Sequence, residues 1–327
     1  MNVDFPYPQR LKVILKRMAA DRTFKTFVLA LMLIAAMGLV RPDKPEGVPG
    51  KRFWAMKISW KDYADIVVTG DSRVLGGVSP GRMEKTLSGR RIVNYGFVNN
   101  LYDPEYLEAI DQVLSRRSEF KTVVLGITPH SLTNDPDILG QFSELKRLSK
   151  RDLFMDIHFA GLMDFFDYMS FRDALLGLFP GLAKSHTRRE FFADGWLAYS
   201  KHPPGEKREL KKYRRMYEKC RVSPAVVDNV MNYVTRWTTS GIRVYGVLVP
   251  TCREMVALEN ALSGFDRADF ADAFRAAGGV WIDVDQAAYD SFDGSHLQRQ
   301  SALEFSDDLA SGICRIEQQS ETACSVD

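Results

Sequence analysis

The chain has 327 residues, of which 45% are hydrophobic and 26% are charged. This is an ordinary globular composition, and the length fits one α/β domain with insertions or two small domains. The formal net charge of +2 is too small to indicate a nucleic acid or another polyanion as a partner.

The basic side chains are concentrated at the N-terminus, beside the most apolar run of the chain. Residues 1–41 contain seven Lys or Arg against two Asp, and residues 26–40 contain no charge. A membrane-spanning helix needs about 20 largely apolar residues, and Lys25 extends the run to Phe24 if its side chain snorkels.

Because most of the basic residues precede this run, the positive-inside rule places the N-terminus in the cytoplasm and the rest of the chain outside. We predict one uncleaved helix in the inner (plasma) membrane, with residues 1–41 as cytoplasmic tail and anchor. A cleaved signal peptide and a buried helix are the alternatives. Residues 42–60, rich in Pro, Gly and Lys, are predicted to form a tether before a domain at 61–327.

Short apolar runs with many β-branched residues alternate with helical patterns in this domain. Continuous apolar runs are typical of strands buried on both faces of a parallel sheet. The pattern predicts a doubly wound α/β fold, a flavodoxin-like three-layer sandwich with a central parallel sheet. The expected strands are residues 64–70, 91–96, 121–127, 242–250 and 279–284, and the expected helices are 104–116, 224–238, 267–277 and 297–313.

About 110 residues separate the third and fourth expected strands, more than a crossover helix needs. We interpret residues 135–221 as an insertion or lid. It contains an aromatic stretch at 154–179 and a basic stretch at 201–221. The aromatic stretch is either core or an acyl-binding groove. The basic stretch is either a solvated helix face or a surface for anionic headgroups or an acidic polymer.

The four cysteines are Cys220, Cys252, Cys314 and Cys324, and none has the spacing of a metal site. Two disulfides and four free thiols both remain open. The chain also has no phosphate-binding loop, no dinucleotide fingerprint and no zinc-protease motif, so we expect neither a metal nor an organic cofactor.

The first expected strand ends in Gly70, Asp71 and Ser72. A serine at the carboxyl end of a central strand lies where open α/β sheets hold ligands. Near the other end of the chain, Asp293 and His296 are three residues apart. This spacing brings a carboxylate close to an imidazole, which is the arrangement that activates a serine for acyl transfer.

These segments resemble the conserved blocks of the SGNH/GDSL hydrolase superfamily over about residues 64–313. That family has Gly-Asp-Ser after its first strand, a glycine in its second block and Asp-x-x-His near its end. Ser72, Gly96 and the Asp293–His296 pair match these blocks in order. The resemblance implies a nucleophile at Ser72, a base at His296 oriented by Asp293, and oxyanion donors at the Ser72 and Gly96 backbone N–H groups.

One block departs from the family, because Thr128 occupies the position of the oxyanion-hole asparagine. The resemblance places Thr128 among the oxyanion-hole residues, and the side-chain amide is either missing or supplied by Asn99 or Asn100, which are also candidates for substrate contacts. Membrane-anchored relatives without this asparagine include proteins that modify alginate and teichoic acids, and the layout here is similar to theirs. Arg73, beside the nucleophile, and His130 are further candidates for substrate contacts.

The resemblance implies a serine-dependent acyl-ester hydrolase or O-acyltransferase. Its substrate is expected to be an extracytoplasmic glycan or envelope polymer, and its partners the bilayer and a polysaccharide-modification machinery. The alternative is a non-catalytic protein on the same scaffold that assists polysaccharide modification or export, since a fold alone does not establish activity.

Overall fold

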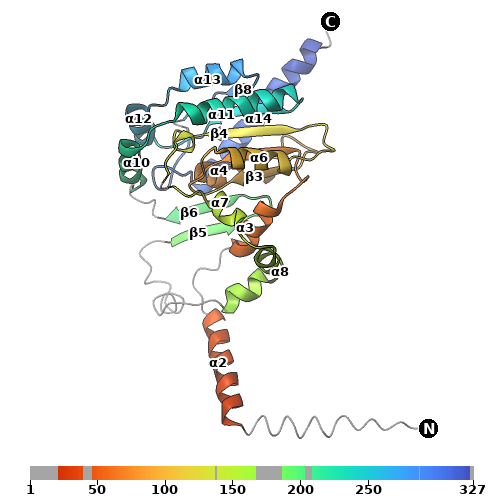
Figure 1. Cartoon of the computed structure of the whole chain (residues 1–327), viewed down its shortest axis with the longest axis vertical. Coiled ribbons are helices and arrows are strands. Elements are labelled where there is room, and N and C mark those ends of the chain that lie inside the picture. The colour runs from red at the N-terminus through yellow and green to blue at the C-terminus, as the bar shows by residue number, and fades with distance from the viewer. Residues whose placement is uncertain are drawn as a thin grey trace, which may run out of the picture. The chain divides into compact units, whose positions relative to one another are not determined.

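The computed structural model describes residues 21–39, 46–136, 138–166, 186–202, 208–286 and 288–324 (Figure 1). The chain divides into two compact units. One combines Met1–Lys44 with Gly161–Lys184, and the other combines Pro45–Ala160 with Ser185–Asp327. The second unit carries all the strands and every candidate site residue.

A five-stranded, all-parallel sheet forms the centre of the second unit, with the strand order β3-β2-β4-β7-β8. Each of the five strands falls within a segment predicted as a strand, so the prediction of an α/β fold with a central parallel sheet is confirmed. The strands are β2 (Ile66–Gly70), β3 (Ile92–Gly96), β4 (Thr122–Ile127), β7 (Arg243–Leu248) and β8 (Val280–Ile282).

Both faces of the sheet are covered, which is why its strands are apolar throughout. Val67 and Val123 pack into one core, whereas their neighbours Val68 and Val124 pack into another. The first core is completed by α6 (Pro104–Val113), α11 (Pro224–Thr239) and α13 (Arg267–Ala276). The second is completed by α4 (Ser72–Gly77), α5 (Pro80–Met83) and α14 (Arg299–Cys324).

Local signals account for the starts of the covering helices. Asp103 and Asp266 cap α6 and α13 by accepting hydrogen bonds from backbone N–H groups of the first turn, as N-cap carboxylates commonly do. Pro104 and Pro224 occupy the first helical positions of α6 and α11, where a missing N–H costs nothing. All four predicted helices are present, although α14 begins two residues later than expected and runs to Cys324.

The segment predicted as an insertion or lid builds part of the body of the second unit. Its elements there are α7 (Gln141–Lys146), β5 (His186–Phe191), β6 (Leu197–His202) and α10 (Arg208–Lys219), together with α8 (Lys150–Phe166) as far as Ala160. β5 and β6 pair antiparallel, and β1 (Glu46–Gly47) joins them to form a second sheet. The helix α10 packs on α12 (Arg253–Leu262) through buried Tyr213 and Tyr217.

The strand β5 carries the sequence His-Thr-Arg-Arg-Glu-Phe, so the apolar pattern that revealed the central strands is missing there. The second half of the aromatic stretch at 154–179, residues 167–179, lies outside the described residues. Within its described part, Phe154 and Phe159 of α8 are exposed, so these two side chains are not core.

The predicted tether at 42–60 is wrong for its second half. Residues Gly50–Ser59 form the helix α3, which buries Phe53 and Lys57 completely. Lys57 Nζ donates to the carbonyl oxygens of Gly96, at 2.7 Å, and of Gly195, at 3.0 Å. The ammonium group also lies over the rings of Phe53 and Phe97. A lysine in a Pro- and Gly-rich segment reads as solvated, and only the tertiary structure shows that this one is enclosed.

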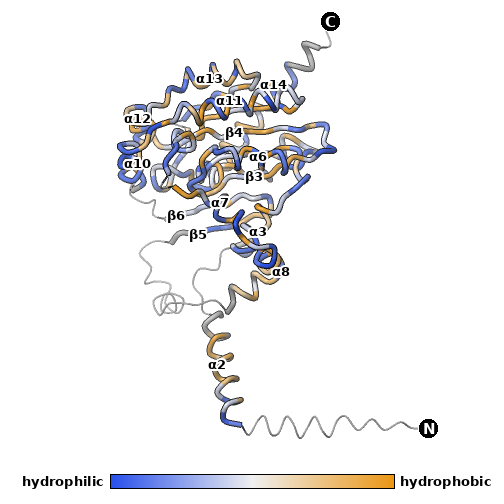
Figure 2. Tube along the Cα trace, viewed as in Figure 1, coloured by the Kyte–Doolittle hydropathy of each residue, from blue (hydrophilic) through white to orange (hydrophobic). Residues whose placement is uncertain are grey.

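The apolar run at the N-terminus forms the helix α2 (Arg22–Leu39), which Figure 2 shows as largely hydrophobic. No helix in the part of the chain that the structure describes combines the length and the hydropathy needed to span a membrane. Residues 1–20 lie outside the described residues. They include four of the seven basic residues on which the predicted membrane topology depends. Cys220, Cys252 and Cys314 are free thiols in the structure.

The buried amino group of Lys57 makes a pH dependence testable. Burial lowers the pKa of Lys57 well below its ordinary value, although the Asp194 carboxylate acts in the opposite direction. Between the lowered folded-state pKa and the unfolded value of about 10.4, the unfolded chain binds more protons, so this group adds stability as the pH rises.

We therefore expect the stability of the wild type to rise relative to Lys57→Met as the pH rises toward the unfolded pKa of about 10.4, as measured by urea unfolding at two pH values below it. The control is Lys61→Met, which removes one exposed charge. The difference in stability between the wild type and Lys61→Met should be the same at both pH values. A wild-type to Lys57→Met difference that is the same at both pH values would show that Lys57 is not held in a desolvated state.

Candidate active site

Three glycines at the carboxyl ends of neighbouring strands support the candidate site. Gly70 of β2 is in register with Gly96 of β3 and with Gly126 of β4. A Cβ atom on Gly96 would lie 2.6 Å from the Leu75 backbone nitrogen, and one on Gly126 would lie 2.2 Å from the Val74 side chain. Side chains are therefore excluded from this row, and α4 lies directly on the strand ends.

Ser72 begins α4 immediately after β2 and is the only residue of this helix that is not buried. Asp71 caps the helix by accepting a hydrogen bond from the Arg73 N–H at 2.9 Å. Among the residues that the structure describes, the Ser72 N–H has no acceptor. Ser72 therefore presents a hydroxyl and an unused backbone donor at the same point.

The segment before α14 brings His296 to Ser72. His296 Nε2 lies 2.9 Å from Ser72 Oγ, and His296 Nδ1 lies 2.8 Å from Asp293 Oδ2. The contacts that we expect between these three residues are thus present in the structure. His296 and Asp293 keep 17% and 15% of their side-chain surface exposed, so the chain of contacts ends at the surface of the protein.

The Asp293 carboxylate is held in its ionised form and in one orientation. Its Oδ1 accepts hydrogen bonds from the backbone N–H groups of Ser295 and His296, each at 2.9 Å. Burial acts to raise the pKa of Asp293, but these bonds and the contact with the imidazole hold it below its ordinary value. An ionised Asp293 accepts from Nδ1–H, which leaves Nε2 as the nitrogen that accepts the serine proton.

The turn that carries His296 is supported on two sides. Thr251, just after β7, donates to the Gly294 carbonyl oxygen at 2.8 Å. The ring of Phe292 stacks on the imidazole with centroids 5.8 Å apart, and Tyr199 of β6 packs against Phe292. The second sheet thereby reaches the candidate site, a contribution that no sequence motif indicated.

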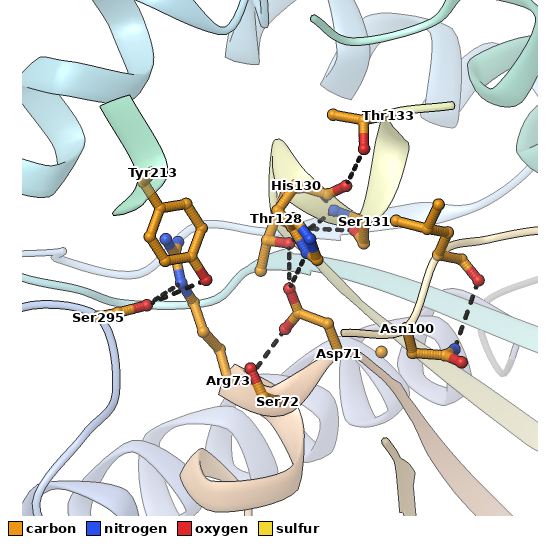
Figure 3. A network of polar contacts seen from close by, with 12 residues as sticks. Asp71, Ser72, Arg73, Asn100, Thr128, His130, Ser131, Thr133, Tyr213 and Ser295 are labelled. Carbon is orange, nitrogen blue, oxygen red and sulfur yellow. Dashed lines mark hydrogen bonds and ion pairs between the residues drawn. The ribbon is translucent and has the colours of Figure 1, made fainter. Parts of the chain in front are cut away.

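A buried polar cluster lies behind Ser72 (Figure 3). Thr128 Oγ1 donates to Asp71 Oδ2 at 2.6 Å, and His130 Nδ1 lies 3.4 Å from the same oxygen. Burial acts to raise the pKa of Asp71, but His130, the Arg73 charge and Thr128 hold it below its ordinary value. His130 is buried and turned toward Asp71, so it supports the turn before Ser72 rather than lining an open site.

Two of the three residues predicted as oxyanion donors already donate hydrogen bonds to groups within the protein. The Gly96 N–H donates to Asn94 Oδ1 at 2.9 Å. The Thr128 hydroxyl donates to Asp71, and the Thr128 N–H donates to Ser131 Oγ at 3.2 Å. Both groups thus have acceptors within the protein, and their role as oxyanion donors stays a prediction. Gly96 matters here because its lack of a side chain admits α4.

The two asparagines after β3 differ in their surroundings. Asn99 is exposed and has a left-handed backbone with a φ of 50°. Asn100 is 2% exposed, and its amide nitrogen makes a single long contact of 3.4 Å to the Leu101 carbonyl oxygen. An amide carries two protons, so one proton of Asn100 has no acceptor among the described residues. Of the two asparagines, Asn100 is therefore the buried one.

Arg73 does not contact an open site, and its assignment as a substrate-binding residue is wrong. Its side chain is 1% exposed and is paired with Glu259 of α12, with Nη2 and Oε1 2.5 Å apart. Its Nε donates to Ser295 Oγ at 3.0 Å, and the ring of Tyr213 lies over the guanidinium (Figure 3). The signal available in the sequence was only an arginine next to the candidate nucleophile, which fits a surface or a buried role equally.

Comparison with known proteins does not place the chain in a family. No protein-family model matches it, no curated protein matches it, and no solved structure matches it.

Proposed function

We propose that the chain is a serine-dependent acyl-ester hydrolase or O-acyltransferase of the SGNH/GDSL type. The observation that carries the proposal is the continuous chain of contacts from Ser72 Oγ through His296 to Asp293, at 2.9 and 2.8 Å. These distances lie within the range over which a general base takes the proton of a nucleophile.

The reaction follows from this geometry. Ser72 Oγ attacks the ester carbonyl carbon while His296 Nε2 takes the hydroxyl proton, and the carbonyl oxygen becomes an oxyanion. His296 then returns the proton to the departing alcohol oxygen, which leaves an acyl group on Ser72. Water or a second hydroxyl attacks this acyl group while His296 takes its proton, the bond between the acyl carbon and Ser72 Oγ breaks, and His296 returns the proton to Oγ. Asp293 stabilises the imidazolium in both steps.

The oxyanion is expected to bind to the free Ser72 N–H and to the Asn100 amide. Each is a donor without a competing strong acceptor among the described residues, whereas Gly96 and Thr128 are occupied. Two donors form a smaller hole than the three of the family pattern. Since one lost donor costs about 10²–10³ in rate, modest activity is expected.

The strand order also supports the family proposal. In chain order the five parallel strands are arranged as second, first, third, fourth and fifth, which is the order of flavodoxin-like doubly wound sheets. In such sheets ligands bind beyond the carboxyl ends of the strands. Ser72 follows the carboxyl end of the strand β2, between β3 and β4.

A surface glycan or envelope polymer is the proposed substrate, with an O-acyl group transferred to or removed from it. The support is the apolar helix α2 with its basic flank, which favours a membrane-anchored protein with the catalytic domain outside the cytoplasm. The basic face of α10 (Lys211, Lys212, Arg214 and Arg215 are exposed) suits an acidic polymer.

The second candidate is a non-catalytic protein on the same scaffold that assists polysaccharide modification or export. The observation that favours it is the commitment of Gly96 and Thr128 to contacts within the protein. A scaffold that had lost activity has no need for an oxyanion hole.

The first test of the proposal is labelling of the detergent-solubilised full chain with an alkyl fluorophosphonate, which reacts with activated serines. Intact and peptide mass spectrometry should locate the probe on Ser72, and Ser72→Ala should abolish it. Asp293→Asn should slow labelling by about 10⁴-fold, because the imidazole then adopts the wrong tautomer. The remote variant Ser240→Ala serves as control and labels like the wild type.

Acceptor sugars separate a transferase from a hydrolase in the same preparation. With an activated acyl ester as donor, a transferase forms acyl-sugar and turns over faster as oligosaccharide is added, since the acceptor replaces water in the second step. Unchanged rates with all acyl groups released to water identify an esterase. A wild type in which Ser72 never reacts with probe or ester supports the non-catalytic candidate.

Asn100→Ala tests the proposed hole. The variant removes an amide donor, so the rate of Ser72 acylation should fall by about 10²-fold with little change in KM. The matched variant is Asn99→Gly, which changes the exposed neighbour and tolerates its left-handed backbone, and it should retain the wild-type rate. Equal rates for Asn100→Ala and the wild type would remove Asn100 from the proposed hole.

A C-terminal reporter tests the topology. Fusion of alkaline phosphatase to the full chain should give an active enzyme in a bacterial host, because the positive-inside rule places the body outside the cytoplasm. The corresponding fusion to green fluorescent protein, which fluoresces in the cytoplasm, should be dark. The reverse pattern would contradict the proposed topology and the proposed extracytoplasmic substrate.

A further inference from the structure

The residue after the nucleophile and the residue before the base are in contact. Arg73 follows Ser72 in α4, and Ser295 precedes His296, 222 positions along the chain from Arg73. Arg73 Nε donates to Ser295 Oγ at 3.0 Å, and both side chains are buried. One hydrogen bond therefore joins the two chain segments whose next residues are Ser72 and His296.

Two partners, Glu259 and Tyr213, hold the guanidinium in the orientation that this bond requires. Glu259 contacts Nη2 at 2.5 Å and Nη1 at 3.4 Å, which leaves Nε directed to Ser295. The Tyr213 ring lies 5.1 Å from the guanidinium carbon, and Ser295 Oγ donates to Tyr213 OH at 3.3 Å. Tyr217 OH donates to the other side of the network, at Glu259 Oε1. A planar fork held by a carboxylate and an aromatic ring has little rotational freedom.

We propose that Arg73 is a positioning residue that fixes the separation of Ser72 and His296 through its bond to Ser295, with Glu259 setting the orientation of the guanidinium. The expected effect of Arg73 on the rate rests on the proposed serine chemistry. The expected effect on the distance between Ser72 and His296 does not depend on that chemistry. It assigns the α10 and α12 helices a role in the site although neither of them carries a triad residue.

The kinetic importance follows from the reach of proton transfer. A base and a nucleophile exchange a proton over about 2.6–3.2 Å, and a misplacement of about 1 Å costs on the order of 10²-fold in rate. The contact between Ser72 and His296 is 2.9 Å, so little displacement is tolerated. Asp293 fixes the rotation of the imidazole, whereas Arg73 fixes the distance between the two segments.

Ser295→Ala is the variant of choice, because it removes the acceptor of Arg73 Nε and leaves the ion pair with Glu259 in place. The matched control is Thr251→Val, which removes a buried hydrogen bond of 2.8 Å to the Gly294 carbonyl in the same turn without touching Arg73. Both variants lose one buried hydroxyl, so comparable falls in Tm are expected.

Kinetics of acylation by p-nitrophenyl acetate separate the two variants. Ser295→Ala should lower kcat by roughly tenfold to a hundredfold at nearly constant KM, and Thr251→Val should lower it by less than about threefold. Ser295→Thr, which restores a hydroxyl, should recover part of the loss. Equal losses in Ser295→Ala and Thr251→Val would overturn the proposal, since any loosening of the turn would then suffice.

Crystal structures of Ser295→Ala and Thr251→Val provide a readout that needs no activity. The Ser72 Oγ to His296 Nε2 separation should lengthen in Ser295→Ala and remain near that of the wild type in Thr251→Val. An unchanged separation in Ser295→Ala overturns the positioning role even if the enzyme is active. The two proposals can also fail separately. If the wild type does not acylate but the separation lengthens in Ser295→Ala, the proposed function is contradicted and the positioning role of Arg73 is retained.

Discussion

The buried ion pair between Arg73 and Glu259 constrains everything around the candidate site. A guanidinium that is 1% exposed must keep its carboxylate partner, because removal of one member of a buried pair leaves an uncompensated charge and costs about 3–5 kcal/mol. This requirement ties α4 to α12, and Tyr213 brings α10 to the same place. The helix that starts with Ser72 is thus held by this charge pair and by its close packing on Gly70, Gly96 and Gly126 at the strand ends.

Hydrogen bonds within the protein also occupy two of the groups predicted as oxyanion donors, at Gly96 and Thr128. Asp71, Thr128 and Ser131 satisfy one another behind the nucleophile, and Asn94 satisfies Gly96. Buried polar groups without partners are costly, so a closed network of this kind stabilises the turn before Ser72. Outside this network, the Ser72 N–H and one amide proton of Asn100 have no acceptor among the described residues. The contacts from Ser72 through His296 to Asp293 are complete in the structure, whereas an oxyanion hole of two donors is our proposal.

The central sheet and the three contacting residues were predictable because their signals are local or periodic. Continuous apolar runs marked the five strands, and the Asp293 to His296 spacing marked the imidazole pair. Arg73, His130 and Lys57 were not predictable, since a charged side chain reads as solvated until tertiary packing encloses it. The pairing of β5 and β6 was missed for a related reason, because residues such as Arg188 and Arg189 hide the strand pattern. Gly96 was found, but for its N–H rather than for the side chain that it lacks.

The central claim is that Ser72 is an activated nucleophile whose oxyanion binds at its own N–H. A crystal structure of the phosphonylated full chain tests this most directly, because the tetrahedral phosphorus imitates the acyl-transfer intermediate. The account predicts phosphorus bonded to Ser72 Oγ, with its oxygen about 2.7–3.1 Å from the Ser72 nitrogen and facing the Asn100 amide. Phosphorus on another residue, or an oxygen turned away from the Ser72 N–H into solvent, would contradict it.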